Sequence, residues 1–305
     1  MVHRYLTYKS DDILRLMDVD TLLASIEQSI KTDKEREYFL IHVARYKVIL
    51  EEIEKIYRNA KVDDRASKIG VEDRRSKIDR ADPSAIPYSQ LPSSILHPLS
   101  SRRIRVLDVG CFPYHLGAAL EMMNYEVYGI SSSHEPIKSS RIKVCNIEKD
   151  TFPFKDNFFD LVICTEVLEH LPQSPLHAIR EMYRVTMPRG HVLLTTPNIA
   201  RSINRAKILL GKSVTYPLHQ VLENDGEGSN IYHRHNREYT LSELTTLMRH
   251  GNWNVARATH FVSYTPMRRR IIPDSLLLKA GKYANYMLMM LLSSLRDTLL
   301  VIGEK

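Results

Sequence analysis

The stretch RIRVLDVGCFPYHLG, residues 103–117, decides how this chain folds. Its first half is a short apolar run, interrupted at Asp108, which is typical of a strand buried within a parallel sheet. Gly110 then permits a tight turn, because glycine adopts backbone conformations that other residues avoid. A helical pattern begins near Leu116. The stretch therefore predicts a strand, a turn and a helix, which is the first unit of an α/β sheet.

The residues that follow repeat this alternation of short apolar runs and helical patterns. Such alternation is typical of a doubly wound α/β fold with a mostly parallel seven-stranded sheet. Because the last strand comes after a long excursion, we expect it to lie beside an antiparallel neighbour. We expect strands at residues 103–110, 125–131, 141–147, 158–165, 190–196, 253–264 and 298–303, and helices at 116–123, 175–186 and 240–251.

Three regions are expected along the chain. Residues 1–60 have the pattern of an N-terminal helical extension. Residues 61–101 are dense in opposite charges and then in Pro and Ser, which is typical of a linker. Residues 102–305 should form the main domain, with a lid insertion at about 199–231 and a helical excursion at about 265–295.

The N-terminal extension contains one long helix with a regular apolar stripe. Thr32 and Glu35 have the spacing of a capping box that opens this helix. The stripe lasts fewer than three heptads, so docking onto the main domain is favoured over a coiled coil, and a dimer contact stays open. Its members alternate steps of four and three residues: Phe39, Val43, Tyr46, Leu50, Ile53 and Tyr57.

The composition is that of an ordinary globular protein. The chain has 305 residues, of which 43% are hydrophobic and 26% charged, and this excludes wholesale disorder, collagen and coiled-coil rods. The net charge is +7, and the whole excess falls in residues 199–305, where 15 Lys and Arg stand against 8 Asp and Glu. An anionic partner or a solvated basic face would each account for this surplus.

The cysteines and the apolar tracts indicate in which cellular compartment we expect the protein. Cys111, Cys145 and Cys164 lie in apolar segments without metal-type spacing, so we expect reduced core residues of a cytoplasmic protein. The first twelve residues are charged and lack the pattern of a signal peptide. The most apolar tract, residues 283–295, is too short for a transmembrane segment. Core burial and contact with a membrane surface both stay open for it.

Ligands of open α/β sheets bind beyond the carboxyl ends of the strands, where the strand order reverses. The residues directly after each predicted strand are therefore the candidates for a site. After the first strand, Gly110 allows close approach of the backbone to a ligand. Asp108 can accept hydrogen bonds from a cationic or hydroxyl-bearing ligand.

Four segments, in this order and spacing, carry a resemblance to a known family. They are VLDVGC, FPFKDNFFDLVICTEVLEHL, IREMYRVTMPRGHVLLTTPN and REYTLSEL. With them the chain, over roughly residues 102–251, resembles the class I S-adenosylmethionine-dependent methyltransferases. The resemblance implies a Rossmann-like fold, S-adenosylmethionine as cofactor and methyl transfer as the activity.

The resemblance also implies roles for individual residues. Asp108 and Gly110 match the loop that holds the methionine part of the cofactor, and Phe112 belongs to the same loop. Ser131 matches the position that contacts the ribose. Asn146 and Ile147 match the adenine position, and Thr165 with Glu166 matches the strand end beside the methyl group.

Several positions depart from the family pattern. Phe112 and Tyr114 stand where later glycines of the loop are usual, Ser131 replaces the ribose carboxylate, and Asn146 replaces an aspartate. A hydroxyl and an amide can still bond these groups, and Glu135 is another source of a carboxylate. These departures leave open a non-catalytic scaffold that keeps the fold and binds a partner.

A cluster of ionisable residues follows the fourth predicted strand. On a helical turn, Glu166 would face Glu169 and His170, because positions three and four apart share a face. His170 is a suitable base for an acceptor hydroxyl near neutral pH. We predict Glu166, His170 and His235 as catalytic residues, although His170 packing at a helix start is an equal alternative.

The same residues allow a metal site as an alternative. Glu166, Glu169, His170 and His235 would offer two carboxylates and two imidazoles to a divalent cation such as magnesium. Similar arrangements occur in small-RNA 2′-O-methyltransferases and in O-methyltransferases of ubiquinone synthesis. Against this reading, Thr240 and Glu243 form an ordinary capping box, which explains part of the REYT motif.

The favoured function is O-methylation of a small molecule or glycan precursor, with an anionic or phosphorylated acceptor included. A metal-dependent RNA 2′-O-methyltransferase is the second reading, because no RNA-binding module is visible. The third is the non-catalytic scaffold. Monomer and homodimer both stay open.

Overall fold

The computed structural model describes residues 18–78, 102–132, 139–215, 217–218, 232, 234–264 and 276–305, with the backbone alone at 58–78 and 276–277. The chain divides into two compact units. The first joins Met1–Val48 to Ile104–Lys305, and the second is Ile49–Arg103. The candidate site lies entirely within the first unit.

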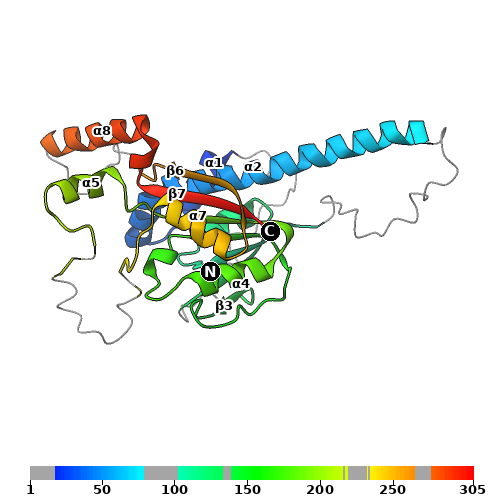
Figure 1. Ribbon diagram of the computed structural model, residues 1–305, viewed down its shortest axis with the longest axis horizontal. Coiled ribbons are helices and arrows are strands. Elements are labelled where there is room, and N and C mark those ends of the chain that lie inside the picture. The colour runs from blue at the N-terminus through cyan, green and yellow to red at the C-terminus, as the bar shows by residue number, and fades with distance from the viewer. Residues whose placement is uncertain are drawn as a thin grey trace. The chain divides into compact units, whose positions relative to one another are not determined.

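The first unit is built on a seven-stranded sheet with the order β3-β2-β1-β4-β5-β7-β6 (Figure 1). The described strands are β1 (Arg105–Val109), β2 (Glu126–Ser131), β3 (Ile142–Val144), β4 (Phe159–Thr165), β5 (Thr186–Pro197), β6 (Asn254–Phe261) and β7 (Thr298–Glu304).

The sheet is mostly parallel, with antiparallel pairing at one edge. β1 pairs in parallel with β2 and β4, and the parallel pairing extends to β3 and β5. β7 is antiparallel to both of its neighbours, β5 and β6. The doubly wound, mostly parallel seven-stranded fold is therefore confirmed, and so is the antiparallel last strand. The strand order reverses between β1 and β4, where a ligand site is expected.

Helices flank the sheet, and some of them pack an apolar stripe on it. The described helices of the sheet domain are α3 (His115–Met122), α4 (Leu176–Val185), α5 (Ser202–Leu209), α7 (Leu241–His250) and α8 (Leu276–Leu291), with short 3₁₀ turns at Leu168–His170 and Ser293–Leu295. α4 and α7 share one core with residues of β1, β4 and β5, in which Met182 of α4 and Val162 of β4 take part. The capping box of Thr240 and Glu243 forms as predicted.

The N-terminal helices α1 (Val19–Ser29) and α2 (Asp33–Ile78) begin before the sheet. α1 contacts α3, and the start of α2 reaches the same helix, because His115 Nε2 lies 3.3 Å from Glu35 Oε1. The start of the apolar stripe thus packs on the sheet domain: Phe39 and Tyr46 are buried, and the Phe39 ring contacts His115 edge-on.

Several predicted boundaries differ from those of the structure. α2 continues to Ile78, past the linker boundary predicted near residue 60. The predicted lid begins with α5, and its residues 219–231 lie outside the described ones. The predicted excursion contains α8, while residues 265–275 also lie outside the description. Among the described residues, no helix is long and apolar enough to span a bilayer.

Candidate functional site

The turn after β1 is set by the backbone of Gly110. Its φ of +80° is a conformation that residues with a Cβ rarely adopt. A Cβ at this position would lie 2.4 Å from Val167 Cγ2, so the close approach also requires glycine. The amides of Gly110 and Cys111 both donate to the Ile130 carbonyl, at 2.9 and 3.1 Å. These bonds hold the loop to the end of β2.

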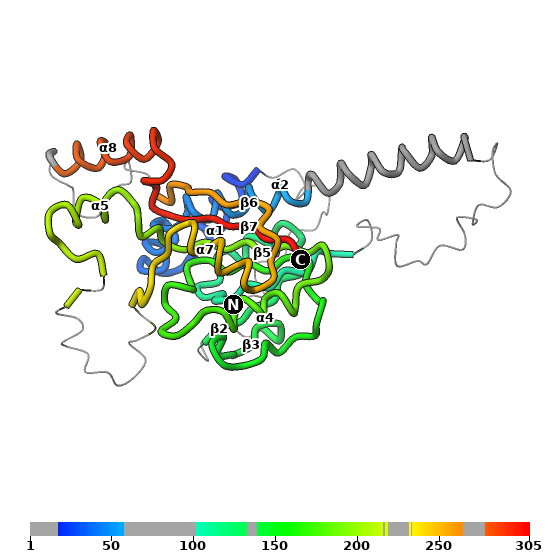
Figure 2. The backbone as a smooth tube through the Cα atoms, viewed as in Figure 1, coloured from blue at the N-terminus to red at the C-terminus, as the bar shows by residue number. Residues whose placement is uncertain are grey.

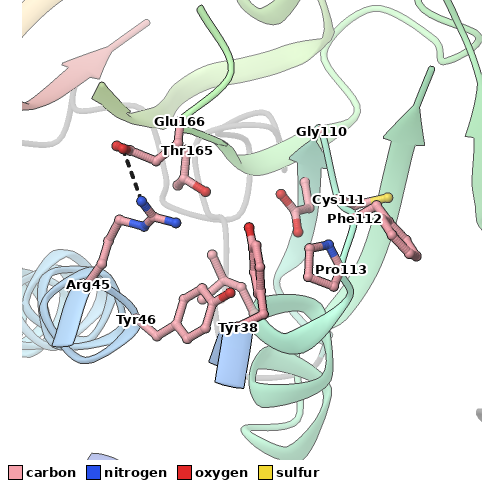
Figure 3. Close-up of a pocket in the computed structure, with 11 residues that line it drawn as sticks. Tyr38, Arg45, Tyr46, Gly110, Cys111, Phe112, Pro113, Thr165 and Glu166 are labelled. Atoms are coloured by element: carbon pink, nitrogen blue, oxygen red, sulfur yellow. Dashed lines mark ion pairs between the residues drawn. The ribbon is translucent and has the colours of Figure 1, made fainter. Parts of the chain in front are cut away.

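A pocket opens beside this turn, at the carboxyl ends of β1 and β4 (Figure 3). One wall comes from the loop after β1, a second from the end of β4, and a third from α2. The lining residues are Tyr38, Arg45, Tyr46, Asp108, Gly110, Cys111, Phe112, Pro113, Leu116, Thr165 and Glu166.

Asp108 is the buried carboxylate of this pocket. Its side chain is 4% exposed, and burial raises the pKa of Asp108 to about 7. Among the described residues, no hydrogen bond or ion pair reaches its carboxyl group. A buried carboxyl without a partner is costly when ionised, and a cationic ligand or a hydrogen-bond donor would remove that cost. The geometry therefore suits a ligand with an ammonium or hydroxyl group.

The helix α2 brings charged and aromatic side chains to the same pocket. Arg45 Nη1 lies 3.0 Å from Glu166 Oε2, and both side chains are largely buried (Figure 3). The other oxygen of Glu166 accepts a 3.0 Å hydrogen bond from Thr195 Oγ1. Tyr38 and Tyr46 face the pocket from the same helix, and burial raises the pKa of both phenols. Glu166 is thus held by two partners.

A second group of ionisable side chains lies just beyond the end of β4. Single ligand atoms from Glu169, His170 and His235 all lie within 4.8 Å of one another. The rings of the two histidines are 4.9 Å apart and nearly perpendicular. Glu169 is fully buried, and burial, with the charge of Glu166 second, raises the pKa of its carboxyl. Its Oε1 has no hydrogen-bond partner among the described residues.

The proton positions of both histidines follow from their partners. His170 Nδ1 lies 3.1 Å from the carbonyl oxygen of Arg234, which can only accept, so Nδ1 is the protonated nitrogen. His235 Nδ1 lies 2.9 Å from Glu238 Oε1. Burial raises the pKa of Glu238, but hydrogen bonds from His235 and Arg201 outweigh burial and lower it to about 2. The Glu238 carboxylate therefore accepts a hydrogen bond from His235 Nδ1. In the neutral form of each histidine, the lone pair therefore lies on Nε2.

The segment that supplies His235 is fixed to the sheet domain by backbone bonds. The amides of Asn236 and Arg237 donate to the Glu169 carbonyl, at 2.6 and 3.2 Å. Asn236 Nδ2 donates to the His170 carbonyl at 2.8 Å. These bonds place His235 beside His170, although the two are 65 residues apart in the sequence.

The remaining predicted cofactor residues lie outside the pocket lining. Ser131 is buried at the end of β2. Asn146 is exposed after β3, and its Oδ1 accepts a 3.0 Å bond from the Glu148 amide. Ile147 is half-buried against the core. Glu135 lies outside the described residues.

The structure divides the predicted site into two groups. Asp108, Gly110, Phe112 and Thr165 line the pocket together. The predicted face shared by Glu166, Glu169 and His170 does not form in that way. Glu166 has a φ of +56°, and the residues after it form only a 3₁₀ turn. Glu166 therefore points into the pocket, where it pairs with Arg45, and does not join the histidine group. Of the four predicted metal ligands, only Glu169, His170 and His235 lie together.

Sequence reasoning missed the three α2 residues of the pocket, Tyr38, Arg45 and Tyr46. Tyr46 belongs to the apolar stripe, which indicated docking of the helix but not its position. For Arg45 and Tyr38 the sequence holds no comparable signal, because nothing local shows that the helix passes the end of β4.

Comparisons with known proteins identify the family of the chain. A family model described as a methyltransferase domain matches residues 84–258. The chain is 30% identical over 105 residues to a ubiquinone biosynthesis O-methyltransferase of Acinetobacter baylyi, covering 31% of this chain and 44% of that protein. It is 35% identical over 106 residues to an uncharacterized methyltransferase of Schizosaccharomyces pombe, covering 29% and 38%. The chain thus matches less than half the length of these curated relatives.

Among solved structures, the chain is similar to an S-adenosylmethionine-dependent methyltransferase from Archaeoglobus fulgidus. The sequence identity is 14% and the TM-score is 0.45, over 67% of this chain and 86% of that one.

Proposed function

The chain belongs to the methyltransferase-domain family, and from this premise we propose that it transfers a methyl group from S-adenosylmethionine to an oxygen of a small molecule or glycan precursor. The family match confirms the resemblance found in the motifs. One observation carries the proposal: the pocket at the carboxyl ends of β1 and β4 holds the buried carboxyl group of Asp108, which has no partner among the described residues.

The residues of the pocket fit the methionine part of this cofactor. Asp108 would accept hydrogen bonds from its ammonium group, which would favour the ionised carboxylate over the neutral acid that burial favours. Gly110 keeps the turn short enough for the backbone to approach a ligand. When bound, S-adenosylmethionine supplies a methyl group activated on a positively charged sulfur.

His170 would act as the general base in this proposal. The Arg234 carbonyl fixes the proton on Nδ1, so Nε2 can accept the proton of an acceptor hydroxyl. The Glu166 side chain cannot serve in the same way without breaking its bonds to Arg45 and Thr195. We therefore assign Glu166 to positioning α2 beside the pocket, and His170 to proton transfer.

Two further observations support the proposed class of acceptor. The curated relative of Acinetobacter baylyi is named as an O-methyltransferase, which supports oxygen as the acceptor atom. The basic surplus of residues 199–305 supports the inclusion of phosphorylated acceptors in a screen.

The test is methyl transfer from isotopically labelled S-adenosylmethionine to panels of sugar phosphates, phenols and RNA. The Asp108→Asn variant tests whether turnover depends on this pocket. Asp156→Asn, which changes an exposed carboxylate paired with Arg184, is the matched control. Label transfer by the wild type and by Asp156→Asn, and its loss in Asp108→Asn, is the expected result. Equal transfer by all three would contradict the proposed site.

A second candidate is a divalent-cation-dependent RNA 2′-O-methyltransferase, favoured by the group of Glu169, His170 and His235. One ligand atom from each of the three residues lies within 4.8 Å of the others, and together they offer one carboxylate and two imidazoles to an ion such as magnesium. Both histidines donate their other nitrogen to an oxygen, which is the support that metal-binding histidines usually have. The ion would hold the hydroxyls of a substrate and lower their pKa.

Chelation separates the two candidates. The metal reading predicts that activity disappears with a chelator and returns with magnesium or manganese. It also predicts that Glu169→Gln and His235→Asn abolish activity at every metal concentration, whereas His250→Asn, at an exposed helix end, leaves activity unchanged. Full activity in a chelator would exclude the metal and leave His170 as the base.

A further inference from the structure

Exposed apolar side chains gather on two helices, α5 and α8. Of the 17 large hydrophobic side chains exposed in the described residues, 11 belong to these helices or to the residue after each. Leu209 is 87% exposed and Leu291 is 78% exposed, which is unusual for leucine on a globular domain. The eleven are Ile203, Ile208, Leu209, Leu210, Leu278, Tyr283, Met287, Leu288, Met290, Leu291 and Leu292.

The two helices are neighbours in the fold. They lie side by side (Figures 1 and 2). Between them, Ser202 Oγ donates to Asn285 Oδ1 at 2.5 Å. Asn285 Nδ2 in turn donates to the Tyr264 hydroxyl at 2.7 Å. The polar contacts thus lie between the helices, while the apolar side chains named above face outward. We call these eleven residues the α5–α8 surface.

The exposed charged side chains described on α5 and α8, and in the few residues after α5, are all basic. The sequence holds no Asp or Glu in residues 199–218 or in residues 276–296. Exposed Arg205, Lys207 and Lys212 lie on or just after α5, and Lys279 lies on α8. Apolar and basic side chains without acidic ones are the composition of helices that lie in the plane of an anionic membrane surface.

We infer that the α5–α8 surface docks the protein on the surface of a membrane that contains anionic lipids. The apolar side chains enter the boundary between headgroups and acyl chains, and the basic side chains remain at the level of the lipid phosphates. Neither helix is long enough to cross the bilayer, so both lie along it. This inference does not depend on methyl transfer, because it uses no residue of the pocket.

Charge complementarity favours lipid over a second copy of the chain. In a two-fold dimer the same patch would meet itself, so basic residues would face basic residues. Anionic headgroups neutralise these charges, and each Lys or Arg near such a surface strengthens binding. The lipid surface therefore satisfies both the apolar and the charged parts of the patch.

The α5–α8 surface is connected to the candidate site. α5 follows β5 directly, and Asn198, at the end of that strand, donates through Nδ2 to the carbonyls of Ser294 and Arg296 after α8. Arg201, before α5, pairs with Glu238, which holds His235. Docking would thus bring the side of the domain that carries the histidine group toward the membrane.

The test is co-sedimentation of the full chain with vesicles of phosphatidylcholine alone and with added phosphatidylglycerol, at low and high salt. We expect the wild type to bind the anionic vesicles at least about tenfold more tightly than the neutral ones, with binding weakened by salt. Leu209→Ser with Leu291→Ser, and separately Lys207→Glu with Lys212→Glu, should each lower binding at least about tenfold.

Matched controls come from the other edge of the sheet. Val144→Ser, at an exposed position of β3, and Lys143→Glu with Lys149→Glu should leave vesicle binding unchanged. Circular dichroism checks that every variant keeps its fold. The proposal is overturned if the wild type does not sediment with anionic vesicles, or if the α5–α8 variants bind as the wild type does. If the wild type does not bind vesicles but self-associates in light scattering, and the α5–α8 variants do not self-associate, the surface would instead be assigned to contact with a second copy.

Discussion

The pocket around Asp108 and the group of Glu169, His170 and His235 follow strands of one sheet but are built differently. The pocket depends on backbone geometry at Gly110 and on one helix that passes over it. The histidine group depends on side chains from two distant segments, fixed by hydrogen bonds to carbonyl and carboxylate oxygens. A local motif can therefore predict the part of the pocket after β1, whereas only the fold assembles its α2 wall and the histidine group.

The largest expected effect sharpens the role of the histidine group. His170→Asn keeps a donor for the Arg234 carbonyl but removes the base at Nε2. We expect kcat to fall by about 100- to 10,000-fold, with cofactor binding unchanged. His177→Asn, which removes a half-buried histidine bonded to the Asp150 carbonyl outside both groups, is the matched control. Similar rates for His170→Asn and wild type would remove His170 from the mechanism.

The next effect tests whether α2 belongs to the pocket. Arg45→Met leaves the Glu166 carboxylate buried without its ion partner, which should lower the free energy of unfolding by about 3 kcal/mol. Adding Glu166→Gln should restore most of the loss, because the amide keeps a bond to Thr195.

Lys47 provides the control for this measurement on the same helix. Its ion pair with Asp20 is exposed, so Lys47→Met should cost less than about 1 kcal/mol in chemical denaturation. Equal costs for Arg45→Met and Lys47→Met would show that α2 does not close the pocket through Glu166.

A smaller effect concerns the pH dependence of stability at Asp108. Burial raises the pKa of this carboxyl to about 7, above its ordinary value of 3.8. The folded protein therefore keeps a proton that the unfolded chain has already released. This contribution to stability is complete below pH 3.8 and is lost as the pH rises to about 7.

Asp108→Asn should remove this dependence, because the amide does not titrate. Between about pH 5 and about pH 8, the free energy of unfolding of the wild type should fall by about 2 kcal/mol more than that of the variant. Denaturant melts at the two pH values provide the measurement, with Asp156→Asn as the exposed control. Parallel pH profiles for Asp108→Asn and the wild type would mean that Asp108 is already ionised in the folded state.

Much of the sheet could be predicted from the sequence because its signals are local. The apolar run before Gly110 and the alternation after it indicate each strand without reference to distant residues. The position of Asp108 in the pocket follows from the general rule for strand ends. The antiparallel β7 was predictable from the long excursion before it.

Other features could not be predicted, because they depend on contacts between distant segments. The sequence around Glu166 does not show that this residue has a φ of +56°, the backbone conformation in which its side chain pairs with Arg45. The end of α2 was placed too early because dense charge resembles a linker. In that segment Asp64 and Lys68 are four residues apart, as are Asp73 and Lys77, a spacing that favours a helix.

The most direct test of the central claim is a calorimetric titration of the full chain with S-adenosylmethionine and with its demethylated product. The account predicts saturable binding of both, weakened about 10- to 100-fold in Asp108→Asn because a charged hydrogen-bond acceptor is lost. Repeating the titration with magnesium would show whether the histidine group contributes. If neither compound binds the folded wild type, the account is contradicted, and a non-catalytic scaffold with this fold becomes the better explanation.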